Sequence, residues 1–232
     1  MVLVKKIHQI FFDFDGKVLE DYPAFSASRA KFKNMEGWSY TLWDESMVAD
    51  VIKQKYPHVF DEYNALPHAI QKVDLAKYII ADAFGGVVAD LDVIPSTHLE
   101  NIVSSPCTFD RCSRANVVAN DFFYTEIGLP GIFEYFSTNL ARVKSIPVYK
   151  IWKMRFIFQT TGPDFFTRYL KKAGLNKFTK RLSCRSFMDP RQNYRAVSNP
   201  HAKLKIMHHL SWKPHVCSDG RNDKLTDARG VV

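Results

Sequence analysis

Two Asp-x-Asp pairs in this sequence have the residue types and the spacing that suit chemistry. Asp13 and Asp15 lie in "QIFFDFDGKVLED", where an apolar stretch runs into Asp-x-Asp-Gly, and Asp90 and Asp92 lie in "GGVVADLDVIPS". One carboxylate can attack a phosphorus atom while its neighbour transfers a proton. Alternatively, a carboxylate pair can hold Mg²⁺ or Mn²⁺, because hard oxygen ligands suit these cations.

The first pair resembles the opening motif of haloacid-dehalogenase-type phosphohydrolases. In that interpretation Asp13 is the nucleophile and Asp15 the acid/base, and the second pair must supply the late magnesium site. The helical segment before Asp90 leaves little room for that family's other motifs, and the rest of the chain has no role in it. We favour a polar turn in which Gly16 supplies a positive φ, and the phosphohydrolase is kept as the alternative.

The second pair follows an apolar segment that is typical of a strand buried on both faces. Alternation along a strand predicts that Asp90 and Asp92 face one way while Leu91 faces the core. An unpaired carboxylate pair at the end of a buried strand is costly, and ligands of open α/β sheets bind at the carboxyl ends of strands. The pattern therefore predicts a divalent cation at Asp90 and Asp92.

The elements that position this pair are a helix over residues 68–84, a stop at Gly85 and Gly86, and a strand over residues 87–94. This order predicts an α/β sandwich. We also expect a helix over residues 45–56, capped by Asp44. Further strands are expected over residues 5–12, 38–43, 119–128 and 202–212, and further helices over residues 22–35, 130–143 and 161–174.

The bulk composition narrows the class of protein. The chain has 232 residues, 46% of them hydrophobic, which suits one domain with a sizeable core. The sequence has no run of apolar residues long enough to span a membrane and no signal peptide, so we expect a cytoplasmic protein. The net charge of +8 favours anionic partners, but no nucleic-acid-binding motif accompanies it, so non-catalytic polyanion binding is only a second alternative. The four cysteines are expected to be free thiols.

The segment "QKVDLAKYIIADAFGGVVADLDVIPS" resembles the central motif of glycosyltransferase family 32, which includes fungal Golgi mannosyltransferases, and that of the clostridial toxin glucosyltransferases. Further landmarks stand in the family's order: "KKIHQIFF", "YTLWDE", "TTGP" and "HHLSW". Three positions depart from the pattern: Lys77 stands for the usual Arg, Val88 for Tyr and Phe11 for Trp. The chain looks most like the short soluble versions of bacteria and large DNA viruses.

The resemblance implies a GT-A-like fold with one Rossmann-type nucleotide-sugar-binding domain. Its central sheet is expected to be mixed, mostly parallel and flanked by helices. We expect this domain over residues 1–217 and a polar tail over residues 218–232.

The resemblance also implies the reaction, a metal-dependent retaining transfer of a hexose or deoxyhexose. The donor is a nucleoside-diphosphate sugar, with a UDP-sugar favoured over a GDP-sugar, and the acceptor is a glycan or a protein. In these enzymes the departing phosphate helps to deprotonate the acceptor in a front-face displacement. No carboxylate is required to be a covalent nucleophile, and Asp121 stays open as a candidate.

The resemblance assigns roles residue by residue. Asp92 binds Mn²⁺ or Mg²⁺ directly, Asp90 holds the ribose and the water shell of the metal, and His209 is the third ligand, with His208 as the alternative. The remaining candidates contact the donor or acceptor. They are His8, Gln9 and Phe11 for the nucleobase, Asp74 and Lys77 for hydroxyls and phosphate, Asn120 and Asp121 for the sugar or acceptor, and Ser211 and Trp212 for the diphosphate.

Overall fold

The computed structural model describes residues 3–13, 16–111, 117–146, 153–175, 179–182, 187–188 and 204–206. Within these ranges no helix is long and apolar enough to cross a membrane. The proposed boundary between a domain and a tail at residues 217 and 218 lies outside them and stays a prediction.

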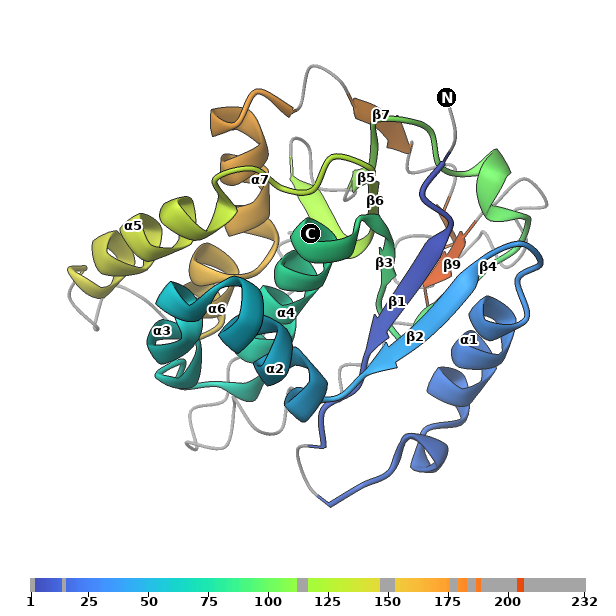
Figure 1. The fold of residues 1–232 in the computed structure, drawn as a ribbon, viewed down its shortest axis with the longest axis horizontal. Coiled ribbons are helices and arrows are strands. Elements are labelled where there is room, and N and C mark those ends of the chain that lie inside the picture. Colours follow the sequence, from blue (N-terminus) through green and yellow to red (C-terminus); the bar gives the residue numbers. More distant parts are fainter. Residues whose placement is uncertain are drawn as a thin grey trace, which may run out of the picture.

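A six-stranded sheet with the order β2-β1-β3-β6-β5-β7 forms the centre of the molecule (Figure 1). β1 pairs in parallel with β2 and β3, β5 pairs in parallel with β7, and β6 runs antiparallel to β3 and β5. The strands are β1 (Lys6–Ile10), β2 (Ser39–Trp43), β3 (Gly86–Ala89), β5 (Cys107–Arg111), β6 (Val118–Thr125) and β7 (Thr179–Leu182). The prediction of a mixed, mostly parallel sheet is confirmed.

A second, smaller sheet has the order β4-β9-β8. Its strands are β4 (Val93–Pro95), β8 (Phe187–Met188) and β9 (Leu204–Ile206). The strand expected over residues 202–212 is described only as β9, because the residues after 206 lie outside the described part of the chain. β9 brings this late segment against β4, which directly follows the second Asp-x-Asp pair.

Helices cover both faces of the large sheet (Figure 1). α1 packs on the face that carries Val87 and Ala89, and α2, α4, α5 and α7 pack on the face that carries Val88. The α-helices are α1 (Pro23–Lys33), α2 (Glu45–Lys55), α3 (Phe60–Asn64), α4 (Ala69–Phe84), α5 (Ile132–Lys144), α6 (Lys153–Thr160) and α7 (Pro163–Lys172). Short 3-10 helices lie at Leu19–Asp21, Pro57–Val59 and Leu99–Asn101.

Several local signals in the sequence have their expected structural outcome. The Asp44 side chain accepts a hydrogen bond of 2.8 Å from the backbone N–H of Met47, which caps α2. Pro163 occupies the first turn of α7, where its missing N–H costs nothing. The sequence patterns therefore located the helices at 22–35, 45–56, 68–84, 130–143 and 161–174 to within a few residues of their observed bounds.

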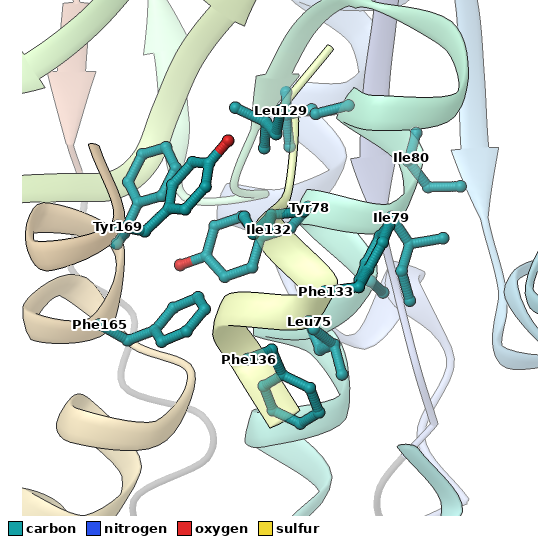
Figure 2. Packing of buried hydrophobic residues seen from close by; sticks show 14 of the residues in the cluster. Leu75, Tyr78, Ile79, Ile80, Leu129, Ile132, Phe133, Phe136, Phe165 and Tyr169 are labelled. Atoms are coloured by element: carbon teal, nitrogen blue, oxygen red, sulfur yellow. The ribbon is translucent and has the colours of Figure 1, made fainter. Parts of the chain in front are cut away.

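The larger apolar core lies between the sheet and α2, α4, α5 and α7. Figure 2 shows labelled side chains of α4, α5 and α7 that point toward one another, among them Leu75, Phe136 and Phe165. The rings of Tyr78 and Phe166 stack with their centroids 4.9 Å apart. Each large apolar side chain buried in this way contributes about 1.5–3 kcal/mol, so this core fixes α4 against the sheet.

Two glycines join α4 to β3 and bring β3 close to β1. Gly85 and Gly86 have φ angles of +61° and +92°, which side chains rarely adopt. A Cβ atom on Gly86 would lie 2.5 Å from the backbone oxygen of Lys6, so only glycine fits this contact. The tight turn sets where β3 ends and therefore where Asp90 lies.

The strand expected over residues 87–94 is interrupted at the Asp-x-Asp pair. β3 ends at Ala89, residues 90–92 form a turn, and β4 belongs to the other sheet. The expectation that Asp90 and Asp92 share one strand was therefore wrong, whereas Leu91 is buried as expected. The reason is tertiary: the backbone of β3 stays paired with β6 only as far as Asp90, and the chain then turns away to pair with β9.

Candidate active site

The Asp90–Asp92 turn is held by backbone hydrogen bonds at both of its ends. The N–H of Asp90 donates to the carbonyl of Asp121 at 2.7 Å, and the N–H of Val93 donates to the carbonyl of Asp90 at 3.1 Å. The first contact places Asp90 beside Asp121 on the neighbouring strand. The turn therefore brings the second Asp-x-Asp pair together with a third predicted site residue.

A buried glutamine supports this turn through its backbone. The amide of Gln9 donates to the carbonyl of Asp90 at 3.2 Å and to the hydroxyl of Ser28 at 3.0 Å. The hydroxyl of Tyr40 donates to Gln9 Oε1 at 3.0 Å. Gln9 is fully buried and holds the turn through its hydrogen bond to the Asp90 carbonyl. Its contact with the nucleobase stays a prediction.

Lys77 joins two of the predicted carboxylates. Its ammonium lies 2.6 Å from Asp90 Oδ1 and 3.3 Å from Asp74 Oδ1. Burial of Lys77 opposes its charge, but the two carboxylates outweigh this and hold its pKa above the usual value, so it is a stable cation. The Lys77 side chain is 4% exposed and that of Asp90 is 31% exposed, so Asp90 forms the accessible end of the pair.

Asp74 is buried and accepts hydrogen bonds from two further elements. The amide of Asn120 on β6 donates to Oδ1 at 2.8 Å, and the hydroxyl of Thr161, between α6 and α7, donates to Oδ2 at 3.4 Å. Burial raises the pKa of Asp74 to about 6, although the Lys77 ammonium lowers it again in part. Three of the predicted donor-binding residues, Asp74, Lys77 and Asn120, therefore form one connected group.

Asp121 carries a carboxylate oxygen that lacks a partner. Its Oδ1 is buried and has no hydrogen-bond donor among the described residues. Burial raises the pKa of Asp121 to about 7, and the neighbouring charges of Asp90 and Asp92 add to the rise. A buried acceptor that faces two further carboxylates is unfavourable unless a cation lies near it. The carboxylates of Asp90, Asp92 and Asp121 therefore suit Mg²⁺ or Mn²⁺, which take carboxylate oxygen ligands.

The described residues do not complete a metal site. Among them, no group of three or more His, Cys, Asp or Glu side chains is placed to hold an ion. The predicted third ligand, His209, and its alternative His208 lie outside the described ranges, as do Ser211 and Trp212. Their roles stay predictions.

Three residues on β1 or directly after it are predicted to contact the nucleobase, and they lie in different surroundings. His8 is buried: the indole N–H of Trp43 donates to its Nδ1 at 3.1 Å, so its Nε2 carries the proton and donates to the carbonyl of Gly85 at 3.0 Å. Burial lowers the pKa of His8 to about 4, so the ring is neutral. Phe11 is only partly buried and packs edge-on against Tyr22, 6.3 Å between ring centroids. The structure therefore keeps Phe11 closer to solvent than His8.

Asp13 is the described member of the first Asp-x-Asp pair, and it follows the end of β1. Asp13 is exposed, and its Oδ1 accepts a hydrogen bond of 3.1 Å from the backbone N–H of Lys17. This contact is typical of the polar turn that the sequence favoured. Asp15 lies outside the described residues.

Two residues of the site were missed by the sequence analysis. Tyr78 donates to the carbonyl of Thr161 at 2.7 Å and accepts from Asn120 at 3.1 Å. The position of Tyr78, four residues after Asp74 on α4, was a usable signal. Thr161 lies in the "TTGP" landmark, but no pattern in the sequence shows which side chain this segment contacts.

Comparison with known families identifies the segment that contains most of this group. Residues 25–109 match the family model described as a glycosyltransferase sugar-binding region containing a DXD motif. Residues 25–109 are therefore similar to the sugar-binding region of the DXD-containing glycosyltransferases. This DXD region includes α4, the Gly85–Gly86 turn and the Asp90–Asp92 turn, and the resemblance noted in the sequence is confirmed.

The relatives of the DXD region are fungal and viral. Mannosyl phosphorylinositol ceramide synthase SUR1 of Saccharomyces cerevisiae is 26% identical over 168 residues, which are 72% of this chain and 41% of the yeast protein. Inositol phosphoceramide mannosyltransferase 1 of Schizosaccharomyces pombe is 24% identical over 149 residues, 62% of this chain and 46% of that protein. The chain thus spans less than half the length of these fungal relatives. An uncharacterized glycosyltransferase of Acanthamoeba polyphaga mimivirus is 23% identical over 234 residues, 90% of this chain and 84% of the viral protein.

A solved structure shares the fold. The PaToxG glycosyltransferase superposes with a TM-score of 0.50 at 14% sequence identity, covering 74% of this chain and 69% of that one. This likeness bears on the fold, and it confirms the prediction of a glycosyltransferase-type α/β fold.

Proposed function

We propose that this protein is a metal-dependent, retaining glycosyltransferase. It moves a hexose or deoxyhexose from a nucleoside-diphosphate sugar to a glycan or protein acceptor, and a UDP-sugar is favoured over a GDP-sugar. The match of residues 25–109 to the DXD-containing family model supports glycosyl transfer. The preference for uracil rests on the resemblance of the central motif to the toxin glucosyltransferases.

One observation carries the metal dependence. Among the described residues, no donor reaches the buried Oδ1 of Asp121, which lies near the charges of Asp90 and Asp92. The Lys77 ammonium is paired with Asp74 and Asp90. This arrangement is costly for the protein alone and favourable once a divalent cation binds.

Each residue of the group then has a defined task. Asp92 and Asp90 would hold the cation and its water shell, with His209 as the predicted third ligand. When bound, the cation stabilises the negative charge that develops on the β-phosphate of the donor. Asp74 and Lys77 would hold donor hydroxyls and phosphate, and Asn120 would orient the sugar.

The transfer itself is a displacement at the anomeric carbon. The hydroxyl oxygen of the acceptor forms a bond to this carbon on the face from which the bond to the β-phosphate oxygen breaks. The departing phosphate oxygen takes the hydroxyl proton. The protein holds the acceptor hydroxyl and the leaving phosphate on the same face of the sugar and excludes water, which would otherwise hydrolyse the donor.

Thermal unfolding with a panel of nucleotides tests the donor and the metal together. We expect UDP- or GDP-sugars to stabilise the protein in Mn²⁺ or Mg²⁺ but not in EDTA. A ligand at 100 times its dissociation constant adds about 2.7 kcal/mol. Equal stabilisation in EDTA would refute the metal dependence.

Transfer assays with two matched variants test the site. We expect Asp92→Asn to lower the rate of transfer on the order of 10³-fold with the fold intact, and Asp13→Asn to have little effect. The acceptor panel should contain glycans, proteins and inositol phosphoceramide, the lipid in the names of the fungal relatives. Hydrolysis of phosphate monoesters that is lost in Asp13→Asn would instead establish the phosphohydrolase.

A further inference from the structure

α4 carries a buried polar stripe where a core helix would ordinarily be apolar. Gln71, Asp74 and Tyr78 are three and four residues apart and therefore lie on one face of the helix. All three are buried, and all three contact either the last residue of α6 or the link between α6 and α7. Gln71 donates to the hydroxyl of Thr160, while Asp74 and Tyr78 contact Thr161.

The contacts of Thr161 close a ring of hydrogen bonds around the Asp74 carboxylate. The Tyr78 hydroxyl donates to the carbonyl of Thr161 at 2.7 Å, and the Thr161 hydroxyl donates to Asp74 Oδ2 at 3.4 Å. Asn120 completes the ring by donating to Asp74 Oδ1 at 2.8 Å and to the Tyr78 hydroxyl at 3.1 Å. Both carboxylate oxygens are thus held, each from a different element.

The link that carries Thr161 is itself fixed. The backbone N–H groups of Thr161 and Gly162 both donate to the carbonyl of Ile157 at 3.0 Å. A Cβ atom on Gly162 would lie 2.9 Å from the Cα of Phe158, so the link is packed directly against α6. Thr161 is also fully buried, which leaves its hydroxyl little freedom to turn away.

A hydrogen-bond network of this kind fixes the orientation of its side chains more than it stabilises the fold. Well-packed apolar residues often stabilise a core as much as buried polar groups do, whereas a fully bonded network sets one geometry for its members. Asp74 is the member of this ring that also contacts Lys77, and Lys77 contacts Asp90 of the DXD turn. The ring therefore orients the Asp74 carboxylate, which is linked to Asp90 of the DXD turn through Lys77.

We propose that Thr161 is a positioning residue that, together with Tyr78, holds the Asp74 carboxylate in the orientation required for donor binding. The inference rests on the proposed function, because Asp74 is there the group that binds donor hydroxyls. It assigns a role to the "TTGP" segment: Thr161 acts on the donor through Asp74, and Thr160 does not.

The two adjacent threonines provide a matched test. Thr161→Val removes the hydroxyl at nearly constant volume and leaves Asp74 Oδ2 without that donor. We expect donor affinity in Mn²⁺ to fall about tenfold, the effect of one hydrogen bond to a charged group, with stabilisation by Mn²⁺ alone unchanged. Thr161→Ser should restore affinity, and Tyr78→Phe should weaken it. Thr160→Val makes the same chemical change one residue away and should leave donor affinity at the wild-type value.

A double-mutant cycle on urea unfolding tests the coupling without any donor. We expect the effects of Thr161→Val and Asp74→Asn on the unfolding midpoint to be non-additive, and those of Thr160→Val and Asp74→Asn to be additive. If the wild type binds no sugar nucleotide, the proposed function fails while this cycle still decides the coupling. Additive effects for Thr161 and Asp74, or equal donor affinity in Thr161→Val and Thr160→Val, would overturn the proposal.

Discussion

Asp121→Asn should stabilise the metal-free protein and remove its response to Mn²⁺. The wild-type carboxylate has a buried oxygen that no donor in the described part of the chain reaches. Burial together with the charges of Asp90 and Asp92 raises the pKa of Asp121 from the ordinary 3.8 to about 7. Asparagine keeps the shape of the side chain and loses the charge. The same substitution therefore has opposite effects with and without the cation.

The size of the effect follows from the pKa. Each tenfold change in a protonation equilibrium is worth ~1.4 kcal/mol, so a rise from 3.8 to about 7 makes the ionised carboxylate unfavourable by about 4 kcal/mol above pH 7. Because the folded protein binds the proton more tightly than the unfolded chain, stability falls as the pH rises from about 4 through about 7. Asp121→Asn removes this fall. We expect a gain of about 2–4 kcal/mol at pH 8 in EDTA and almost none at pH 4, because the amide makes imperfect contacts of its own.

Urea unfolding followed by circular dichroism at pH 4, 6 and 8 in EDTA measures the first effect. Thermal unfolding in a titration of Mn²⁺ measures the second, and the variant should lose most of the shift. Asp82→Asn is the matched control, since Asp82 accepts hydrogen bonds from Tyr56 and from the backbone of Leu129, away from the DXD turn. This control should be less stable than the wild type and should keep the full Mn²⁺ shift.

Two results would refute the reasoning on Asp121. A variant that is no more stable than the wild type at pH 8 in EDTA would mean that the folded protein satisfies the carboxylate in another way. A full Mn²⁺ shift in Asp121→Asn would mean that the cation binds without this carboxylate. In either case the buried oxygen would not mark the metal site.

Three further changes test the framework around the site. Lys77→Met leaves the two carboxylates that pair with the ammonium without this partner and should lower the free energy of urea unfolding by about 3–5 kcal/mol. Lys77→Arg should retain more of the stability. Equal losses in the two variants would contradict the ion pairs. Burial lowers the pKa of His8 from 6.5 to about 4, so this ring makes wild-type stability rise by about 3 kcal/mol between pH 4 and 6.5. His8→Gln should lose this rise, so the difference in urea unfolding between wild type and variant should change by about 3 kcal/mol over that pH range. Gly86→Ala introduces a Cβ atom 2.5 Å from a backbone oxygen and should cost more in thermal unfolding than Gly174→Ala, which has a φ of +72° and no atom within 4 Å of the added carbon; equal costs would exclude the clash.

Local patterns predicted α1, α2, α4, α5 and α7 because the signals for each of these helices lie within a few residues of each other. Asp44 caps α2 through Met47, and Pro163 begins α7, as the sequence indicated. The end of β3 was not predictable in this way. Apolar residues recur on both sides of Asp90 and Asp92 as far as Ile94, so the sequence does not show where the strand ends. The backbone partners show it: Asp121 pairs with Asp90, and β9 pairs with the residues that follow the turn.

In the candidate site, too, contacts between residues close in sequence were predictable and contacts that depend on tertiary packing were not. Asp74 and Lys77 are three residues apart on α4, a spacing that places side chains on one face of a helix, and they form an ion pair of 3.3 Å. No local signal indicated that Thr161, far along the chain, donates to Asp74, because that contact depends on how α6 packs against α4. The separate surroundings of His8 and Phe11 also depend on packing, here on the rings of other elements.

The lysine that departs from the family pattern has a local physical explanation. An ammonium is a compact charge with three donors, so Lys77 can contact Asp90 and Asp74 from one point, at 2.6 and 3.3 Å. A guanidinium is planar and binds best to one carboxylate in a forked geometry, which suits a phosphate that lies across the site. With two of its donors directed to carboxylates, the lysine has one left for a ligand. A donor phosphate in this protein must therefore depend on the divalent cation more than it would with arginine at position 77, so the loss of affinity in EDTA should be smaller in Lys77→Arg than in the wild type.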